Sequence, residues 1–303
     1  MTIMTDFQQK ITALLPSTEL RMNESMAKHT SFRIGGPAEV MAFPKSAEEL
    51  QEILKVSALL DCKTAILGAG TNVLAPDEGI EGLVICLKDC MGGMEQLDAN
   101  SIRVGAGVTM SRAAVFAANL RLSGLEFAHG IPGTVGGGVY MNAGAYGGEI
   151  CQVCTQVEVM DMAGNLRIFA GDEMAFSYRH SRLEEEGGIV ISAVFTLFPK
   201  SADEIKALMQ DLMNRRRASQ PLDLPSAGSA FKRPSQGYAA AMIDGAGLKG
   251  YRVGNAAISE KHAGFAVNLG GATAQEVKTL LTDVSDKVFV QTGIRLEPEV
   301  RIW

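Results

Sequence analysis

Two glycine-rich segments contain the residue types that could bind a pyrophosphate group. The first is Gly68–Asn72, and the second covers residues 130–148 and has eight glycines in nineteen residues. Glycine has no Cβ, so its backbone adopts positive φ and approaches a ligand closely. Successive N–H groups in such turns form an anion-binding concavity, and a helix that begins there adds a favourable dipole. A single segment of this kind is equally typical of an ordinary turn, whereas two different ones favour phosphate binding.

Neither segment matches a common nucleotide-binding motif. Residues 68–73 read GAGTNV and lack the third glycine of G-x-G-x-x-G. Pro76, Asp77 and Gly79 then predict a loop where that motif needs a helix. Residues 133–138 read GTVGGG and also fail the spacing, and the chain has no G-x-x-x-x-G-K-[ST] run. A Rossmann or P-loop nucleotide site is therefore excluded.

The composition is that of a globular protein with about two domains. The 303 residues are 47% hydrophobic and 20% charged, and the net charge is −6, from 28 basic and 34 acidic residues. An acidic chain repels phosphate backbones, which excludes nucleic acid as the main partner. Residues 200–262 contain ten Lys or Arg against six Asp or Glu, a local charge of +4. This stretch is where we expect an anionic substrate to bind, although a solvated charged face is the alternative interpretation.

The sequence predicts a soluble, cytosolic and monomeric protein without a metal site. No apolar run reaches the ~18 residues that span a bilayer, and Met1–Gln9 lacks the basic-then-apolar order of a signal peptide. Five cysteines are too few, and an odd number, for a secreted disulfide framework. The pairs Cys86/Cys90 and Cys151/Cys154 have no histidine at a spacing that would complete a zinc site. No metal and no membrane partner are expected.

Hydrophobic periodicity predicts an α+β chain that positions these segments. Ser46-x-x-Glu49 and Thr273-x-x-Glu276 predict capping boxes at the starts of two helices. The first of these helices is expected to bury Leu50, Ile53, Leu54 and Ser57, and the second Val277, Leu280, Leu281, Val284 and Val288. Further helices are predicted at 111–121 and at 202–219, the latter with a buried stripe of Ile205, Leu208, Met209 and Leu212. Strands are predicted at 39–43, 64–67 and 83–87, in a meander at 153–162, 166–169 and 189–198, and at Glu297–Trp303.

A set of eight motifs, in this order along the chain, resembles the UDP-N-acetylenolpyruvoylglucosamine reductase family. The resemblance runs from about Lys28 to Arg301 and is closest to the second, shorter type, which lacks an extra substrate-capping tyrosine loop. The matching stretches are His29–Pro37, Gly68–Leu74, Gly130–Gly147, Tyr178–Arg182, Gly228–Lys232, Gly245–Gly250, Ser259–His262 and Leu296–Arg301.

The resemblance implies an α+β architecture with a bipartite FAD-binding region of the vanillyl-alcohol-oxidase type, followed by a smaller α+β substrate-binding domain. It places an N-terminal extension at 1–20, the FAD-binding region at 21–200 with two lobes divided near 80–95, and the substrate-binding domain at 201–303. FAD is expected to be non-covalent, because residues 68–72 contain neither His nor Cys. NADPH is implied as co-substrate. The implied cofactor-binding residues are Arg33, Gly68, Ala69, Gly70, Thr71, Asn72, Gly130, Ile131, Pro132, Gly133, Thr134, Gly136, Gly137, Asn142, Gly144 and Ala145.

The family reaction reduces the enolpyruvyl ether of UDP-N-acetylglucosamine to the lactyl ether of UDP-N-acetylmuramate, a peptidoglycan precursor. FAD, reduced by NADPH, gives hydride from N5 to the vinyl methylene carbon, and a proton must reach the adjacent carbon. The resemblance makes Ser229 the proton donor, and makes Arg179 and Glu299 the groups that stabilise the enolate. A turn serine is the alternative for Ser229, and an ordinary ion pair with a nearby arginine is the alternative for Glu299.

The nucleotide diphosphate of this substrate requires cations. By the resemblance the substrate-binding residues are Arg217, Lys232, Lys261 and Tyr146, with Asn268 and Tyr251 as further contacts. A cation at the end of a helix, such as Arg217, is also expected simply from the helix dipole. Arg233 stands where many family members have asparagine after Phe-Lys. Two other functions stay open: another FAD-dependent oxidase or dehydrogenase of the same fold, and a non-catalytic nucleotide-binding protein.

Overall fold

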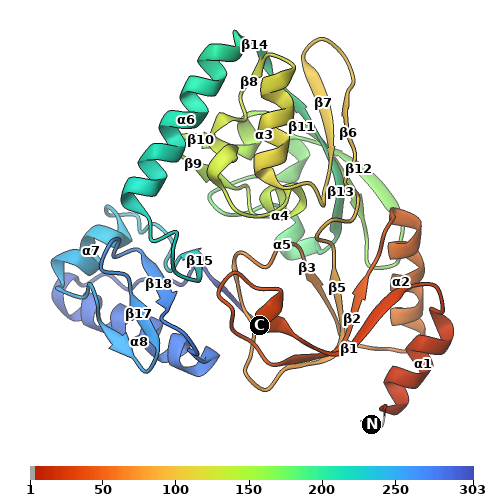
Figure 1. Ribbon diagram of the computed structural model, residues 1–303, viewed down its shortest axis with the longest axis horizontal. Coiled ribbons are helices and arrows are strands. Elements are labelled where there is room, and N and C mark those ends of the chain that lie inside the picture. The colour runs from red at the N-terminus through yellow and green to blue at the C-terminus, as the bar shows by residue number, and fades with distance from the viewer. Residues whose placement is uncertain (1–3) are drawn as a thin grey trace. The chain divides into compact units, whose positions relative to one another are not determined.

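The computed structural model describes residues 4–303, which form two compact units that are each discontinuous in sequence (Figure 1). The first unit contains the chain up to Met22, Val40–Ala69 and Gly82–Arg215. The second unit contains Asn23–Glu39, Gly70–Glu81 and Arg216–Trp303. The first glycine segment is therefore divided between the units after Ala69. None of the helices within residues 4–303 is both long and apolar enough to cross a membrane.

The N-terminal sheet has the strand order β1-β2-β5-β3. The strands are β1 (Glu19–Ser25), β2 (Pro37–Phe43), β5 (Ile80–Cys86) and β3 (Thr64–Leu67). The helices α1 (Asp6–Leu14) and α2 (Ala47–Leu59) contribute to the same hydrophobic core. The fully buried side chains of this core include Ile11, Leu50, Ile53, Leu83 and Ile85.

The helix caps show which local predictions hold. At α2 the Oγ of Ser46 accepts a hydrogen bond from the N–H of Glu49 (3.2 Å), as predicted. The predicted return bond, from the N–H of Ser46 to the carboxylate of Glu49, is wrong. That carboxylate accepts instead from the N–H of the preceding residue, Lys45 (2.7 Å). At α8 (Ala274–Thr292) both halves of the predicted box between Thr273 and Glu276 are present, at 3.1 Å each.

The second sheet of the first unit has the order β12-β11-β13-β7-β6. The predicted meander would place β12 between β11 and β13, and this is wrong, because β11 is the strand that lies between the other two. The hydrophobic pattern explains this arrangement: seven of the eight residues of β13 are buried and need a neighbour on each side, whereas β12 is mostly exposed and forms the edge. The strand bounds are β11 (Cys154–Met160), β12 (Leu166–Ala170), β13 (Ile189–Thr196), β7 (Ser101–Gly105) and β6 (Met94–Gln96).

Short elements complete the first unit. The helices α3 (Met110–Asn119) and α4 (Val135–Tyr140) contact each other, and α4 packs on β7 and β13. The hairpin of β9 (Gly144–Ala145) and β10 (Gly148–Glu149) lies in the second glycine segment. The remaining elements are β8 (Leu122–Ser123), paired with β14 (Phe198–Pro199), and α5 (Leu183–Glu186).

The helix α6 (Ala202–Ser219) has the predicted bounds but a narrower buried stripe than predicted. Ile205 and Met209 are buried in the core of the first unit, whereas Leu208 is 39% exposed. The two buried side chains are four residues apart and lie on one line along the helix, whereas Leu208 projects from a different angle. The prediction that Leu208 belongs to the buried stripe is therefore wrong.

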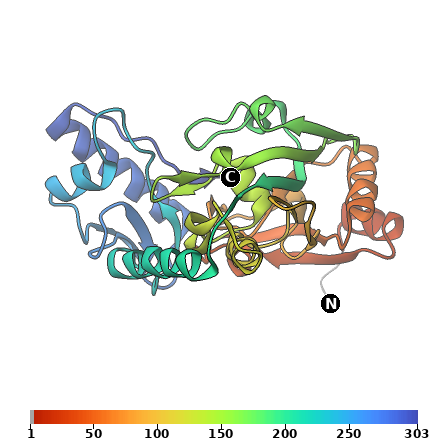
Figure 2. The ribbon, with the colours of Figure 1, turned by 90° about the horizontal axis from the view of Figure 1, so that it is seen from above.

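The C-terminal part of the second unit is a sheet of order β15-β18-β17-β16 with α8 packed on β16, β17 and α7 (Ala239–Gly245). This part is the blue region of Figures 1 and 2. The apolar face of α8 is buried as predicted, with the side chains of Val277, Leu280, Leu281, Val284 and Val288 each no more than 2% exposed. The strands are β15 (Ser226–Ser229), β18 (Phe265–Asn268), β17 (Ala256–Ile258) and β16 (Arg252–Val253).

The last strand is shorter than predicted. Only β19 (Arg301–Ile302) forms, and it pairs in parallel with β4 (Val73–Leu74). Upstream of β19 the chain makes a single bridge, between Phe231 and Pro298. Proline has no N–H to give to a ladder, so continuous pairing from Glu297 does not develop. These pairings place the end of the chain beside the residues that follow the first glycine segment.

Candidate active site

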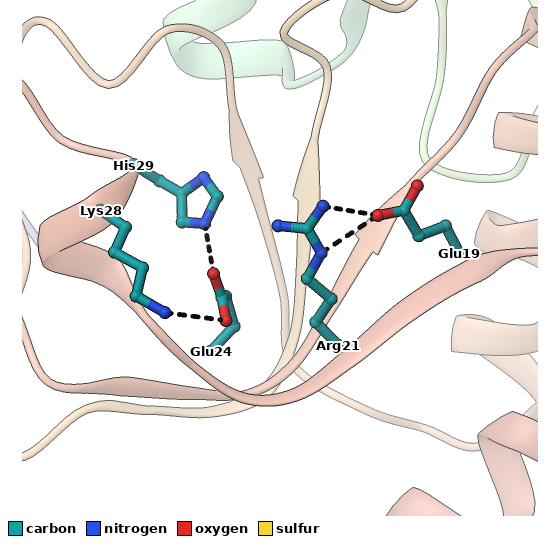
Figure 3. A network of polar contacts seen from close by, with 5 residues as sticks. All are labelled: Glu19, Arg21, Glu24, Lys28 and His29. Carbon is teal, nitrogen blue, oxygen red and sulfur yellow. Dashed lines mark hydrogen bonds and ion pairs between the residues drawn. The ribbon is translucent and has the colours of Figure 1, made fainter.

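The second half of the first glycine segment is fixed to the chain around residue 30. Gly70 has φ +62°, and a Cβ at this position would collide with the carbonyl oxygen of His29. The N–H of Ser31 donates to the carbonyl of Gly70 (3.0 Å). His29 is itself held, because its Nε2 lies 3.0 Å from a carboxylate oxygen of Glu24 (Figure 3). The other oxygen of Glu24 is 3.6 Å from the Nζ of Lys28, so this turn is braced by an ion-pair network.

Figure 3 also shows a separate pair on β1, where the guanidinium of Arg21 contacts Glu19 at 2.6 Å. The same guanidinium lies 4.3 Å from the ring centre of Phe43. Both contacts are partly exposed and belong to the first unit. The contact of Arg21 with Phe43 joins β1 to β2, its neighbour in the N-terminal sheet.

The glycines of the second segment serve two purposes. A Cβ at Gly136 would lie 2.9 Å from the Cβ of Ala106, and one at Gly138 would lie 2.7 Å from the Sδ of Met110. These two glycines therefore allow α4 to pack closely. A Cβ at Gly137 would meet nothing nearer than the Oγ1 of Thr134, at 3.7 Å, so its bare backbone is open.

Thr134 joins the two glycine segments within the first unit. Its Oγ1 accepts from the N–H of Gly137 (3.4 Å) and caps α4. A Cβ at Gly68 would lie only 3.0 Å from the same oxygen. Backbone that is bare at Gly68 and at Gly137 thus lies on either side of the Thr134 hydroxyl, in a cradle that a Cβ at Gly68 would narrow. This is the surface that a pyrophosphate requires, so the residues present fit the diphosphate of FAD. Residues 68–72 offer no His or Cys for a covalent link.

Arg179 is held next to the second glycine segment. It lies in a tight turn between Ser177 and His180, whose backbones exchange two hydrogen bonds of 3.2 Å. The backbone of Arg179 has φ +57°, which is strained for a residue with a Cβ. Its Nη2 donates to the carbonyl of Gly144 (3.2 Å), and its guanidinium lies 5.0 Å from the ring centre of Tyr178.

The side chain of Asn142 is buried and forms hydrogen bonds with other residues of the protein. It is 1% exposed. Its Nδ2 donates to the carbonyl of Ser177 (2.9 Å) and to the carboxylate of Glu149 (3.2 Å), and its Oδ1 accepts from the N–H of Cys151 (2.9 Å). Its side-chain amide therefore supports the turn that carries Arg179. Tyr146, at the tip of the hairpin in this segment, has φ +55° and is 45% exposed.

Ser229 and Glu299 are brought together in the second unit. The N–H of Glu299 donates to the carbonyl of Ala230 (2.9 Å), the residue next to Ser229. The N–H of Lys232 donates to the carbonyl of Glu297 (2.8 Å), which continues this pairing. Ser229 and Glu299 are both half-buried, and no residue in the described part of the chain forms a hydrogen bond with the hydroxyl of Ser229. That hydroxyl is available to a ligand.

Lys261, one of the predicted substrate-binding cations, contacts the backbone of a second, Arg217, in the second unit. The Nζ of Lys261 donates to the main-chain carbonyl of Arg217 (2.6 Å), and both side chains belong to exposed residues. Lys232 instead pairs with Glu297, with 3.1 Å between Nζ and the carboxylate. Two positive charges at the end of α6 are an arrangement that attracts a diphosphate.

The side chains of Asn268 and Tyr251, the two further predicted substrate contacts, form hydrogen bonds within the protein. Asn268 is 3% exposed and its Nδ2 donates to the carbonyl of Phe32 (3.0 Å). The hydroxyl of Tyr251 donates to Asp283 (2.8 Å), which raises the pKa of Tyr251. Arg233, the residue that departs from the family pattern, stacks on Tyr238 at 4.2 Å from the ring centre. Arg33 is exposed and has φ +55°.

Ser31 has a role that sequence reasoning missed. Its Oγ donates to the carbonyl of Ser226 (2.6 Å) and lies 3.4 Å from that of Gly70. It thereby links the first glycine segment to β15, the strand that ends at Ser229. A serine in a loop belongs to no periodic pattern that would predict its contacts. The two partners of Ser31 also lie 195 and 39 residues away in the sequence. Only its place in the motif His29–Pro37 pointed to this region.

Comparison with known proteins identifies the families that two parts of the chain match. Residues 38–169 match the family model of an FAD binding domain, and residues 220–303 match that of the C-terminal domain of UDP-N-acetylenolpyruvoylglucosamine reductase. The predicted α+β architecture, an FAD-binding region followed by a smaller C-terminal domain, is therefore confirmed. The fold and the glycine cradle define an FAD-dependent oxidoreductase.

Two curated relatives and one solved structure are reductases of the same kind. The chain is 45% identical to the UDP-N-acetylenolpyruvoylglucosamine reductase of Agathobacter rectalis, over 98% of both chains. It is 44% identical to that of Syntrophomonas wolfei, over 95% of this chain and 96% of the relative. The crystal structure of the reductase from Thermus caldophilus superposes with a TM-score of 0.78 at 34% identity, over 94% of this chain and 98% of that one. The chain belongs to the UDP-N-acetylenolpyruvoylglucosamine reductase family.

Proposed function

We propose that this protein uses NADPH and non-covalently bound FAD to reduce the enolpyruvyl ether of a UDP-N-acetylglucosamine derivative to UDP-N-acetylmuramate, a precursor of peptidoglycan. The observation that carries the proposal is Ser229, which is half-buried, has a hydroxyl that no described residue engages, and precedes Ala230, the residue whose carbonyl accepts from the N–H of Glu299. Bound FAD supplies a hydride for the alkene carbon, and the protein must then supply a proton to the neighbouring carbon. The protein acts as a monomer on this small-molecule substrate.

Ser229 holds the proton. A serine hydroxyl is a weak acid, and it gives up its proton only to a strongly basic centre such as the carbon next to a carboxylate that has just gained an electron pair. The Oγ–H bond breaks as the new C–H bond forms, and the substrate thereby gains one hydride and one proton. Lys232, three residues further on and exposed, adds a positive charge to the same segment, which favours the negative charge left on the serine oxygen.

Arg179 and Glu299 stabilise the enolate. The planar guanidinium of Arg179 binds the substrate carboxylate with two N–H groups and opposes the charge that develops there. Glu299, with its carboxyl group protonated, donates a hydrogen bond to the same enolate. Both residues are anchored to neighbouring backbone, by Gly144 for Arg179 and by Ala230 for Glu299. Groups that need no rearrangement during the reaction stabilise a transition state most effectively.

The remaining assignments follow the same division between the two regions. Residues 21–200 bind FAD, mainly with the backbone of the two glycine segments, and residues 201–303 bind the nucleotide. Arg217 and Lys261 hold the diphosphate, and Lys232 and Tyr146 add contacts to the substrate. The local charge of +4 over residues 200–262 supports this assignment.

A visible absorption titration under argon tests the proposal. The purified protein should be yellow, NADPH should bleach the flavin band, and the enolpyruvyl nucleotide should restore it with one equivalent consumed per flavin. Mass spectrometry should then find a nucleotide product with two more hydrogen atoms. A colourless preparation would favour the non-catalytic nucleotide-binding alternative. A flavin that NADPH bleaches but the nucleotide does not restore would favour a different oxidoreductase of this fold.

A further inference from the structure

The side chain of Asn72 points to Glu299. Its Nδ2 donates a hydrogen bond to the main-chain carbonyl of Glu299 (3.2 Å). The carbonyl of Asn72 in turn accepts from the N–H of Arg301 (3.0 Å). Asn72 thus forms hydrogen bonds with the last segment of the chain on both sides of Val300. The side chain of Val300 is 4% exposed. A residue in a glycine-rich cofactor loop is expected to face the cofactor, so this contact requires its own explanation.

These bonds close a ring within the second unit. Gly70 is bonded to Ser31, whose Oγ donates to Ser226 in β15 (2.6 Å). The strand β15 leads through Ser229 to Ala230, whose carbonyl accepts from the N–H of Glu299 (2.9 Å). The carbonyl of Glu299 then accepts from Asn72, two residues after Gly70. The backbone of Glu299 is therefore held from opposite sides, by Ala230 at its N–H and by Asn72 at its carbonyl.

The ring limits how Glu299 can move. A residue held at both its N–H and its carbonyl has little backbone freedom to rotate, and this fixes the direction in which the side chain leaves the backbone. Glu299 follows Pro298 and lies outside any strand, so no ladder fixes it. The amide of Asn72 supplies the bond that a neighbouring strand would otherwise supply.

We infer that Asn72 is a positioning residue for Glu299, and that its side-chain amide serves this purpose rather than FAD binding. The inference rests on the proposed role of Glu299 in the reduction of the enolpyruvyl group. It gives the first glycine segment a second role, because its glycines leave room for the cofactor while its asparagine holds the group that acts on the substrate.

The variants Asn72→Asp and Asn72→Ala test this role in the FAD-loaded full-length enzyme. Aspartate keeps the size of the side chain but replaces the N–H donor by an oxygen that repels the carbonyl of Glu299. FAD content and the rate of flavin reduction by NADPH should stay within about twofold of wild type, and the rate of reoxidation by the enolpyruvyl nucleotide should fall about tenfold or more. In a Glu299→Ala background, which removes the carboxyl group, the same changes at Asn72 should cost less than about twofold, since a positioning residue has nothing left to position.

Asn255→Asp is the matched control. The Oδ1 of Asn255 accepts from the Nη2 of Arg252 (3.0 Å) in an exposed turn of the same unit, so the same chemical change should leave both half-reactions intact. The inference is overturned if both Asn72 variants lose FAD, if both half-reactions slow equally, or if the changes at Asn72 and Glu299 multiply independently. A crystal structure of Asn72→Asp adds a readout without turnover, in which the main chain at Glu299 should shift while the glycine loop stays in place. A wild-type enzyme that the nucleotide fails to reoxidise would refute the proposed function instead, and an unshifted Glu299 in that crystal would refute the positioning role.

Discussion

The Nη2 of Arg179 donates a hydrogen bond to the carbonyl of Gly144, 3.2 Å away. One corner of the guanidinium is thereby fixed to the second glycine segment, and this bond limits the orientations that the plane of the group can adopt. Arg179 also has a strained backbone, with φ +57°. Strain of this kind persists only where the surrounding structure enforces it, and it is concentrated at functional positions.

Arg179→Lys should therefore be severely impaired although the charge is retained. An ammonium group cannot bind Gly144 and also hold a carboxylate with two parallel hydrogen bonds. The rate of flavin reoxidation by the enolpyruvyl nucleotide should fall by about a hundredfold, as when one donor to a developing oxyanion is lost. Stopped-flow absorbance measures it. Arg167→Lys, on the exposed edge strand β12, is the control and should behave as wild type. Wild-type kinetics for Arg179→Lys would remove Arg179 from the mechanism.

Ser229→Ala should separate the two half-reactions. Flavin reduction by NADPH does not need a proton from Ser229 and should be largely intact. Reoxidation by the nucleotide should slow by about 10² to 10⁴, which is the usual contribution of a positioned proton donor. Rapid-mixing absorbance at the flavin band resolves the two rates. The exposed Ser235, six residues further on, provides the matched control as Ser235→Ala. An equal loss in both half-reactions would show that Ser229 is not the proton donor.

Asn142→Asp should destabilise the first unit and weaken the support of Arg179. The new carboxylate would be buried against the carbonyl of Ser177 and the carboxylate of Glu149, which now accept hydrogen bonds from this side chain. Loss of buried bonds together with a buried like charge costs about 2 to 4 kcal/mol of unfolding free energy. Urea unfolding followed by circular dichroism measures it. The exposed Asn100→Asp should change the free energy of unfolding by less than about 0.5 kcal/mol. Equal stability of the two variants would contradict the structural role of Asn142.

The elements were predictable where the signal is local. The bounds of β3 and α6, the cap of α8 and the buried face of α8 follow from periodicity and from side chains three or four residues apart. The order of β11, β12 and β13 in the sheet could not be predicted, because it depends on which strand needs a neighbour on each side. A pattern of alternating residues does not reveal this when the strands are short.

The site was predictable as a set of motifs but not as an arrangement. Glycine runs and the resemblance marked the segments that matter. The hydrogen bonds from Asn72 to Glu299 and from Asn142 to Ser177 join residues 227 and 35 positions apart, and no spacing rule connects them. Both asparagines were predicted to bind the cofactor, which is what their place in glycine loops indicates. The structure shows that the side-chain amides of both residues bond to the protein backbone, and their contact with the cofactor stays a prediction.

The stability of the protein should fall at acidic pH because of His262. Its Nδ1 accepts from the N–H of Gly264 (3.1 Å), and the carbonyl of Gly264 accepts from the N–H of Ala230, next to Ser229 (2.8 Å). This acceptor role requires the neutral ring, and burial lowers the pKa of His262, with Lys249 acting in the same direction. The unfolded chain binds a proton as the pH falls through about 6.5, whereas the folded ring resists protonation until the pH is lower. The contribution of His262 is therefore complete above pH 6.5 and is lost as the pH falls through this window.

The variant His262→Gln isolates this contribution, because glutamine can keep an acceptor for Gly264 but does not titrate. Its unfolding free energy should change less between about pH 7.5 and pH 5.5 than that of the wild type, by less than about 1 kcal/mol since the ring is partly solvated and screened. Chemical unfolding at the two pH values provides the comparison. His180 gives the contrast, since its contact with Glu185 raises its pKa and its contribution is lost as the pH rises. Identical pH dependence in the wild type and His262→Gln would show that the titration of His262 does not govern the acid side of the stability profile.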